Sequence, residues 1–191
     1  MQFDETERGF SFSKEAPLDM RMDPNSPRTA MEILNKSSEK ELGMIFRDYG
    51  EEPHWKKAAQ AIVKARCKKK IKNTTQLVDL LLSITGFQKR KRRLHPATLI
   101  FQALRIAVNH ELSSIELGLK KALRFLAKGG KMGVISFHSL EDRLTKNIFR
   151  DACHNSPFFK LLTKKPIIPT LKETHANRRS RSAKMRFIQR V

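Results

Sequence analysis

Residues 129–143 read Gly-Gly-Lys-Met-Gly-Val-Ile-Ser-Phe-His-Ser-Leu-Glu-Asp-Arg, and this stretch decides the fold class. The glycine pair at its start is a strong signal for a chain reversal. The apolar run over 132–137 then predicts a short strand that is buried on both faces of a sheet. A strand of this kind points to an α/β domain, although most of the remaining chain has a helical pattern.

The polar residues after this strand predict the start of a helix. Ser139 followed by Asp142 resembles a capping box, in which a hydroxyl and a carboxylate satisfy free backbone N–H groups. His138 and Ser139 would then lie at the carboxyl end of a strand, where open α/β sheets bind their ligands. We therefore expect a sheet-based catalytic or cofactor-binding domain.

Helical periodicity dominates the chain on the N-terminal side of this stretch. Residues 27–86 contain four short helical segments with tight turns, which predict a small bundle. Ser38 with Glu41 marks the start of one helix, and Asn73 or Thr74 marks another. Residues 1–27 are irregular but carry apolar side chains that need burial, so we expect an ordered loop. Two more helices are expected after residue 96, the second capped by Ser113, and a terminal strand over 185–191.

The charge of the chain is large and one-sided. Its 191 residues carry 39 Lys and Arg against 19 Asp and Glu, a formal net charge of +20. Residues 1–60 hold 9 basic and 12 acidic side chains, whereas residues 61–191 hold 30 and 7. Such asymmetry predicts a polyanionic partner, with nucleic acid ahead of an anionic membrane.

The sequence shows little sign of a membrane-spanning segment or of residence in an oxidising compartment. No segment approaches the roughly 18 apolar residues of a spanning helix, and no signal peptide is recognisable. The two cysteines, Cys67 and Cys153, lack partners at metal-ligand spacing, so no metal is expected. We expect reduced thiols in a cytoplasmic protein.

Two groups of polar residues are candidates for an active site. Asp19, Arg21 and Asp23 alternate in one short loop. They form either a self-satisfied ion-pair loop or an active-site edge whose carboxylates accept amine protons from a base. His138 and Ser139 either line a ligand crevice or only cap a helix; the Gly-x-Ser-x-Gly signature of a nucleophilic serine is absent.

Clusters of cations are candidates for contact with nucleic acid. Adjacent like charges repel one another, so a polyanion contact is favoured over a merely solvated loop, and binding would depend steeply on salt. A basic C-terminal segment is either solvated or contacts phosphate where the last strand begins. The candidate residues are Lys68, Lys69, Lys70, Lys89, Arg90, Lys91, Arg92, Arg93, Arg178, Arg179 and Arg181.

Several motifs follow one another in order along nearly the whole chain. They are Arg8-Gly9-Phe10-Ser11-Phe12, Pro17-Leu18-Asp19-Met20-Arg21-Met22-Asp23, Arg47-Asp48-Tyr49-Gly50-Glu51-Glu52, His95-Pro96-Ala97-Thr98, the segment 101–109, Val134-Ile135-Ser136-Phe137-His138-Ser139-Leu140-Glu141-Asp142-Arg143 and Arg181-Ser182-Ala183-Lys184. Together they resemble the motifs of one family, the ribosomal RNA small subunit methyltransferase H family. Its members transfer a methyl group from S-adenosylmethionine to N4 of a cytidine in the decoding region.

The resemblance implies an α/β fold: a partial Rossmann-like class I methyltransferase domain with an inserted small helical bundle. Residues 1–27 would carry the active-site loop, 28–94 the insertion and 95–191 the C-terminal part of the domain. Asp19, Arg21 and Asp23 would lie beside the target cytidine, with His138 and Ser139 lining the same crevice. The basic runs would face the rRNA of the small ribosomal subunit.

The resemblance also implies where S-adenosylmethionine binds. Of the family's cofactor contacts only one maps onto this sequence, at Gln2. The glycine-rich cofactor loop precedes that position in family members, so we expect this chain to lack the N-terminal cofactor-binding half and Met1 to be an internal methionine of a longer frame. Two further functions stay open: a non-catalytic basic RNA-binding remnant, and a structural basic protein of the ribosome.

Overall fold

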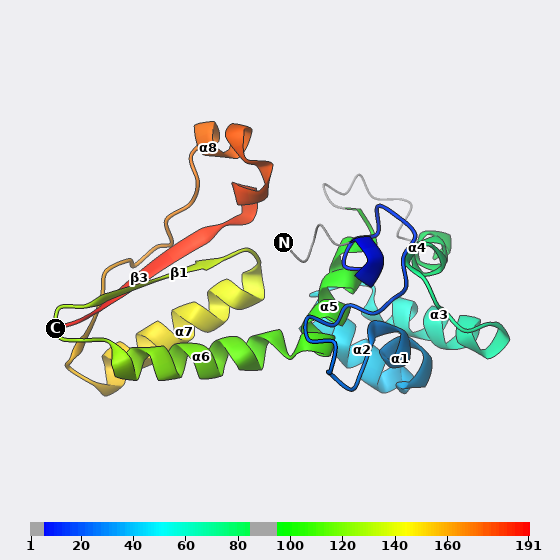
Figure 1. The fold of residues 1–191 in the computed structure, drawn as a ribbon, viewed down its shortest axis with the longest axis horizontal. Coiled ribbons are helices and arrows are strands. Elements are labelled where there is room, and N and C mark those ends of the chain that lie inside the picture. Colours follow the sequence, from blue (N-terminus) through cyan, green and yellow to red (C-terminus); the bar gives the residue numbers. More distant parts are fainter. Residues whose placement is uncertain (1–5, 85–94) are drawn as a thin grey trace. The chain divides into compact units, whose positions relative to one another are not determined.

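The computed structural model describes residues 6–84 and 95–191 and shows a mixed α/β chain (Figure 1). It divides into two compact units, Met1–Glu111 and Leu112–Val191. These limits differ from the expected boundaries after residues 27 and 94, because a single core spans both of those positions. The insertion of residues 28–94 into a methyltransferase domain therefore stays a prediction. Within the described residues, no helix is both long and apolar enough to cross a membrane.

The described residues of the first unit form five α-helices and a short 3-10 helix, η2 (Thr6–Arg8). The α-helices are α1 (Ala30–Lys36), α2 (Glu39–Asp48), α3 (Trp55–Lys68), α4 (Thr74–Ser83) and α5 (Thr98–Asn109). The predicted capping box of Ser38 and Glu41 is present, and Asn73 caps α4 through its side chain. Local capping chemistry therefore sets these helix starts, as the sequence predicts.

The core of this unit joins segments that are distant in sequence. Helices α1 to α4 contribute buried side chains, and so does α5, which packs on α1 and α2. The described part of the N-terminal segment, from residue 6 onward, is ordered as expected, because Phe10, Leu18 and Met20 enter the same core. The loop that carries Asp19 is thus anchored at both sides by buried apolar residues.

The second unit combines helices with a small sheet. Its elements are α6 (Glu111–Phe125), β1 (Lys131–Ser136), α7 (Ser139–Asn155), β2 (Phe159–Leu161), α8 (Leu171–Ala176), the 3-10 helix η3 (Arg178–Ser182) and β3 (Lys184–Arg190). The strand order is β1-β3-β2, and β3 is antiparallel to both neighbours. Strands β1 and β2 are therefore parallel and are connected through α7, with the terminal strand inserted between them.

The prediction that the 132–137 strand is buried on both faces is wrong. Met132 and Val134 pack with α6 and α7 in the core of the unit, which also contains Phe149 and Ile188. Ile135 is 54% exposed on the opposite face. Ile135 is exposed because α6 and α7 both cover the same face of the sheet, the one opposite to it (Figure 1). A continuous apolar run does not distinguish a strand with one uncovered face from a fully buried one.

Two predicted helix starts are displaced in the structure. The helix expected to begin at Ser113 begins at Glu111, directly after His110, whose left-handed backbone (φ 51°) ends α5. The helix expected to be capped by Ser139 is capped by His138 instead. The His138 side chain accepts from the N–H of Glu141, and the Glu141 carboxylate accepts from the N–H of His138. Histidine replaces the hydroxyl of the usual capping box.

Candidate functional site

The loop at Asp19 is closed by a bidentate ion pair. Arg21 Nε lies 2.7 Å from Asp19 Oδ1, and Arg21 Nη2 lies 2.9 Å from Oδ2. Nη1 of Arg21 donates to the carbonyls of Pro24 and Ser26, at 2.6 Å and 3.1 Å. The hydrogen bond from Arg21 lowers the pKa of Asp19 below its usual value. Both oxygens of Asp19 are therefore engaged within the loop itself.

Asp23 lies in the same loop but is used differently. Its Oδ1 accepts a hydrogen bond from the backbone N–H of Asn25, at 2.9 Å. Its Oδ2 accepts no hydrogen bond from the residues that the structure describes, and the side chain is exposed. Asp23 therefore offers a carboxylate oxygen to solvent or to a ligand, whereas Asp19 does not.

A residue outside the predicted site fixes the loop between these two carboxylates. Asn109, at the end of α5, donates to the carbonyl of Met20 and accepts from the N–H of Met22, both at 2.7 Å. Met20 is fully buried and has a left-handed backbone (φ 59°), a conformation that costs about 1–3 kcal/mol in a non-glycine residue. Sequence spacing carries no signal for this contact, which joins positions 87 and 89 residues apart.

Replacement of Asn109 by alanine is expected to destabilise the first unit by about 1–3 kcal/mol, because it leaves the Met20 carbonyl and the Met22 N–H unpaired. The single tryptophan, Trp55, lies in α3 of this unit, so its fluorescence in urea follows this unfolding. Asn25→Ala is the matched control, since the Asn25 side chain is exposed. Equal stability of the two variants would contradict the role of Asn109.

The tip of β1 carries the second predicted pair of residues. His138 Nδ1 accepts from the N–H of Glu141 at 3.4 Å, which makes the ring a helix cap. Burial by itself would raise the pKa of Glu141. The hydrogen bonds from the His138 ring and from the N–H of Phe137 outweigh this effect and hold the pKa below its usual value. Ser139 is the first residue of α7 and is exposed. His138 is thus held in place by its own helix.

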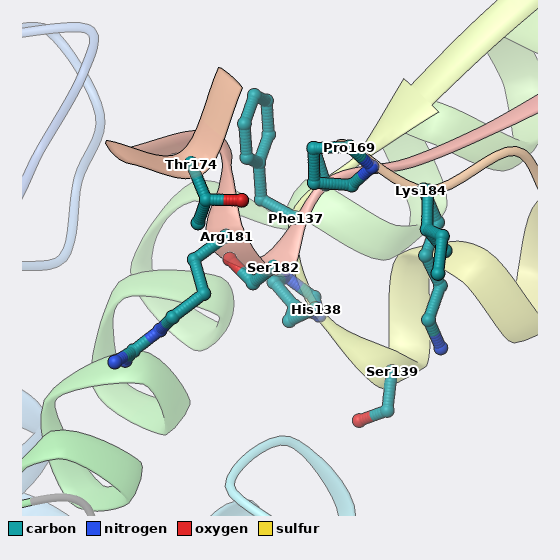
Figure 2. Close-up of a pocket in the computed structure, with 10 residues that line it drawn as sticks. Phe137, His138, Ser139, Pro169, Thr174, Arg181, Ser182 and Lys184 are labelled. Carbon is teal, nitrogen blue, oxygen red and sulfur yellow. The ribbon is translucent and has the colours of Figure 1, made fainter. Parts of the chain in front are cut away.

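A cavity of about 330 Å³ opens at this tip (Figure 2). His138 and Ser139 line it, so the structure brings these two predicted residues to one cavity. The other lining residues come from the end of β1, from α8 and the segment before it, and from the approach to β3. They are Phe137, Ile168, Pro169, Thr174, Arg181, Ser182, Ala183 and Lys184.

A buried ion pair joins the start of α7 to β3, next to the cavity-lining residue Lys184. Arg186 Nε lies 2.7 Å from Asp142 Oδ1, and Nη2 lies 3.1 Å from Oδ2. Both residues are less than 10% exposed. Lys184 Nζ lies 3.5 Å from Asp142 Oδ2. Asp142 thus serves as a link between helix and strand, and the predicted capping role falls to Glu141.

The hydrogen bonds from Arg186 hold the pKa of Asp142 below its usual value. The pair therefore stabilises the second unit fully above the unfolded pKa of about 3.9, and this stabilisation is lost as the pH falls through the lower folded pKa. We expect hydrogen-exchange protection of β3 to fall over that acidic range. In Asp142→Asn the same protection should depend less on pH; an unchanged acid dependence would contradict the assignment.

The predicted RNA-binding cations fall in different parts of the chain. Lys68, Lys69 and Lys70 are exposed at the end of α3 and just beyond it in the first unit. Arg178, Arg179 and Arg181 are exposed in η3 of the second unit. Gln2 and the run Lys89, Arg90, Lys91, Arg92 and Arg93 lie outside the described residues. Asp19, Arg21 and Asp23 belong to the first unit and His138 and Ser139 to the second, so their predicted common crevice stays a prediction.

These features define a mixed α/β protein with a strand-tip cavity and a strongly basic surface. Comparison with known proteins identifies the family. The family model described as the MraW methylase family matches residues 1–191, and the chain belongs to this family.

Curated relatives agree with this assignment. A protein of Pelobacter propionicus is 47% identical and is covered over 65% of its length by the whole chain. Relatives from Persephonella marina and Protochlamydia amoebophila are each 48% identical, with 63% and 65% of their lengths covered by 97% and 100% of the chain. All three are named "Ribosomal RNA small subunit methyltransferase H". The chain thus spans just under two thirds of these relatives.

The cavity at the tip of β1 does not fit S-adenosylmethionine. This cofactor carries a sulfonium cation and a ribose diol, and nucleoside cofactors in α/β folds are usually held by a glycine-rich turn and a carboxylate. The cavity at the tip of β1 is lined by two cations, Arg181 and Lys184, and by neither an acid nor a glycine. It is therefore suited to an anion and not to this cation.

Proposed function

We propose that this chain takes part in the S-adenosylmethionine-dependent N4-methylation of a cytidine in small-subunit rRNA. The observation that carries the proposal is the match of the whole chain to the MraW methylase family, whose curated relatives are named as rRNA methyltransferases. The excess of 30 basic over 7 acidic residues in 61–191 supports a polyanionic substrate. The N4 position of cytidine comes from the motif resemblance.

The loop from Asp19 to Asp23 is proposed to hold the exocyclic amine of the target base. An arylamine is a weak nucleophile, so an acceptor that orients its hydrogens and takes up its proton accelerates the reaction. Asp19 is engaged by Arg21 through both oxygens, whereas Asp23 keeps Oδ2 available. We therefore assign acceptance of the proton to Asp23, and positioning of the loop to Asp19, Arg21 and Asn109.

His138 and Ser139 are proposed to line the substrate crevice. Nδ1 of the His138 ring is occupied by its capping hydrogen bond, and the buried Nε2 lies 3.3 Å from Glu141 Oε1, an arrangement that suits a wall of the crevice. The Ser139 hydroxyl, exposed at the cavity, is a candidate for a hydrogen bond to substrate. The exposed cations at Lys68–Lys70 and Arg178–Arg181 are proposed to contact rRNA phosphates.

The proposal predicts formation of N4-methylcytidine when the purified chain is mixed with S-adenosylmethionine and small ribosomal subunits. Mass spectrometry of the digested rRNA detects the product. Calorimetric titration with S-adenosylmethionine checks binding of the methyl donor separately. Absence of donor binding, alongside salt-sensitive binding to rRNA, would contradict methylation by this chain.

A second candidate function is a non-catalytic RNA-binding chain. The observation that favours it is the poor fit of the cavity at the tip of β1 to the cofactor, combined with 18 basic and 5 acidic residues over 112–191. It predicts rRNA binding whose affinity falls steeply with salt and does not respond to S-adenosylmethionine. The same titration therefore separates the two functions.

A further inference from the structure

We propose that the cavity at the tip of β1 binds one nucleotide of single-stranded RNA. Arg181 and Lys184, which lie on opposite sides of the cavity, would contact the phosphates that flank it, and Phe137 would stack on its base. This inference rests on the proposed function for the choice of RNA as the polymer. It adds a binding subsite with two residues, Phe137 and Lys184, that lie within the matching motifs but are not among the predicted site residues.

The charge of the cavity favours an anion. Its ten lining residues include Arg181 and Lys184 and no acid. Arg181 is exposed and forms no ion pair with any described residue. Lys184 lies 3.5 Å from Asp142, but that carboxylate is already bound at 2.7 Å and 3.1 Å by Arg186. The single carboxylate of Asp142 therefore faces two cations, Lys184 and Arg186, and cannot neutralise both. Positive charge remains on both sides of the cavity, at Arg181 and at Lys184.

The wall formed by Phe137 and its neighbours is apolar and aromatic. Phe137 is 53% exposed and Ile168 is 66% exposed, although both are large apolar side chains. Figure 2 shows the Phe137 ring and Pro169 above His138, with the Arg181 and Lys184 side chains extending downward to the left and to the right of it. An exposed aromatic ring next to cations is the arrangement that binds unstacked bases together with their phosphates.

Size and hydrogen-bonding groups also fit a nucleotide. A volume of about 330 Å³ is at the small end of the usual range for ligand sites, about 300–1,000 Å³. This volume suits an occupant of roughly one nucleotide. Ser139, Thr174 and Ser182 add hydroxyl groups to the lining, and hydroxyls both donate and accept hydrogen bonds. These groups suit the sugar and the base edges.

The test measures binding of a fluorescein-labelled RNA hexamer to the purified chain by anisotropy, over a series of salt concentrations. Phe137→Leu keeps an apolar side chain but removes the aromatic face, and we expect about tenfold weaker binding. Phe125→Leu is the matched control, because Phe125 is 88% exposed at the end of α6 and does not line the cavity. It should bind RNA like the parent chain.

A second pair of variants tests the phosphate contact. Arg181→Gln should bind more weakly and should reduce the slope of log affinity against log salt by about 0.7, as expected for one lost phosphate contact to a single strand. Lys146→Gln removes one exposed charge of α7 away from the cavity and should leave the slope unchanged. Circular dichroism melts establish that all four variants remain folded.

Two probes distinguish a nucleotide from a simple anion. An abasic ribose-phosphate hexamer should bind about tenfold more weakly than RNA and should be indifferent to Phe137→Leu. Inorganic phosphate at the same concentration should not displace RNA; full displacement would overturn the proposal. RNA affinities that are equal in Phe137→Leu and Phe125→Leu would also overturn it, while leaving the methyltransferase proposal intact. No RNA binding by the parent chain would instead count against the rRNA substrate itself.

Discussion

Asp142→Ala is expected to destabilise the second unit by about 3–5 kcal/mol, the effect typical of removing one partner from a buried ion pair. Arg186 is 5% exposed and would keep its charge with no acid beside it. The link between α7 and β3 would be lost at the edge of the proposed nucleotide cavity. Urea unfolding followed by far-UV circular dichroism measures the change.

Trp55 fluorescence provides an internal reference for this experiment. The only tryptophan lies in the first unit, so its transition should stay near the parent value. Asp151→Ala is the matched control: its partner Arg150 is 3.2 Å away, and both side chains are more than half exposed. Exposed pairs contribute only about 0–1 kcal/mol. A loss below about 1 kcal/mol in Asp142→Ala would show that the pair does not hold the sheet to α7.

Asp23→Asn is expected to lower methyl transfer to cytidine by about 10²- to 10⁴-fold, the usual contribution of a general base. Asparagine keeps the size of the side chain and can still accept from the N–H of Asn25. It cannot take up a proton from the base. Quantification of N4-methylcytidine by mass spectrometry measures the rate, and RNA affinity should change little.

Asp79→Asn is the control, since Asp79 is an exposed acid on α4. Asp19→Asn separates the two roles proposed for the loop. It breaks the bidentate pair with Arg21, so its effect should include a loss of stability in Trp55-monitored unfolding. Full activity in Asp23→Asn, with activity lost in Asp19→Asn at unchanged stability, would reverse the assignment of the proton acceptor.

The sequence predicted the local elements of this chain well. The starts at Ser38 and Asn73 follow from capping chemistry confined to three or four residues. The strand near Met132 and the terminal strand near Ile188 follow from short apolar runs. Family membership is confirmed by the match over residues 1–191, because long motifs carry specific information that short patterns lack.

Side-chain partners across the fold were not predictable from pattern. The sequence suggested Asp142 as a cap, but the structure pairs it with Arg186, 44 residues away. The sequence suggested Asp19 and Asp23 as equivalent carboxylates. In the structure Arg21 binds Asp19, whereas Asp23 accepts only from the N–H of Asn25 among the described residues. Asn109 gave no signal as a loop clamp. Periodicity reports which face of an element is apolar, and it contains no distance between elements.

The stretch 129–143 shows which features the sequence determines and which depend on the tertiary structure. Its residues by themselves determined a turn, a strand, a polar tip and a helix, because the forces that set these features act within a few residues. Only the tertiary structure decided that α6 and α7 share one face of the sheet and that Phe137 stays exposed. It also brought Arg181 and Lys184 beside His138. These outcomes depend on packing between segments distant in sequence, and the cavity exists only because that packing leaves one side of the strand tip open.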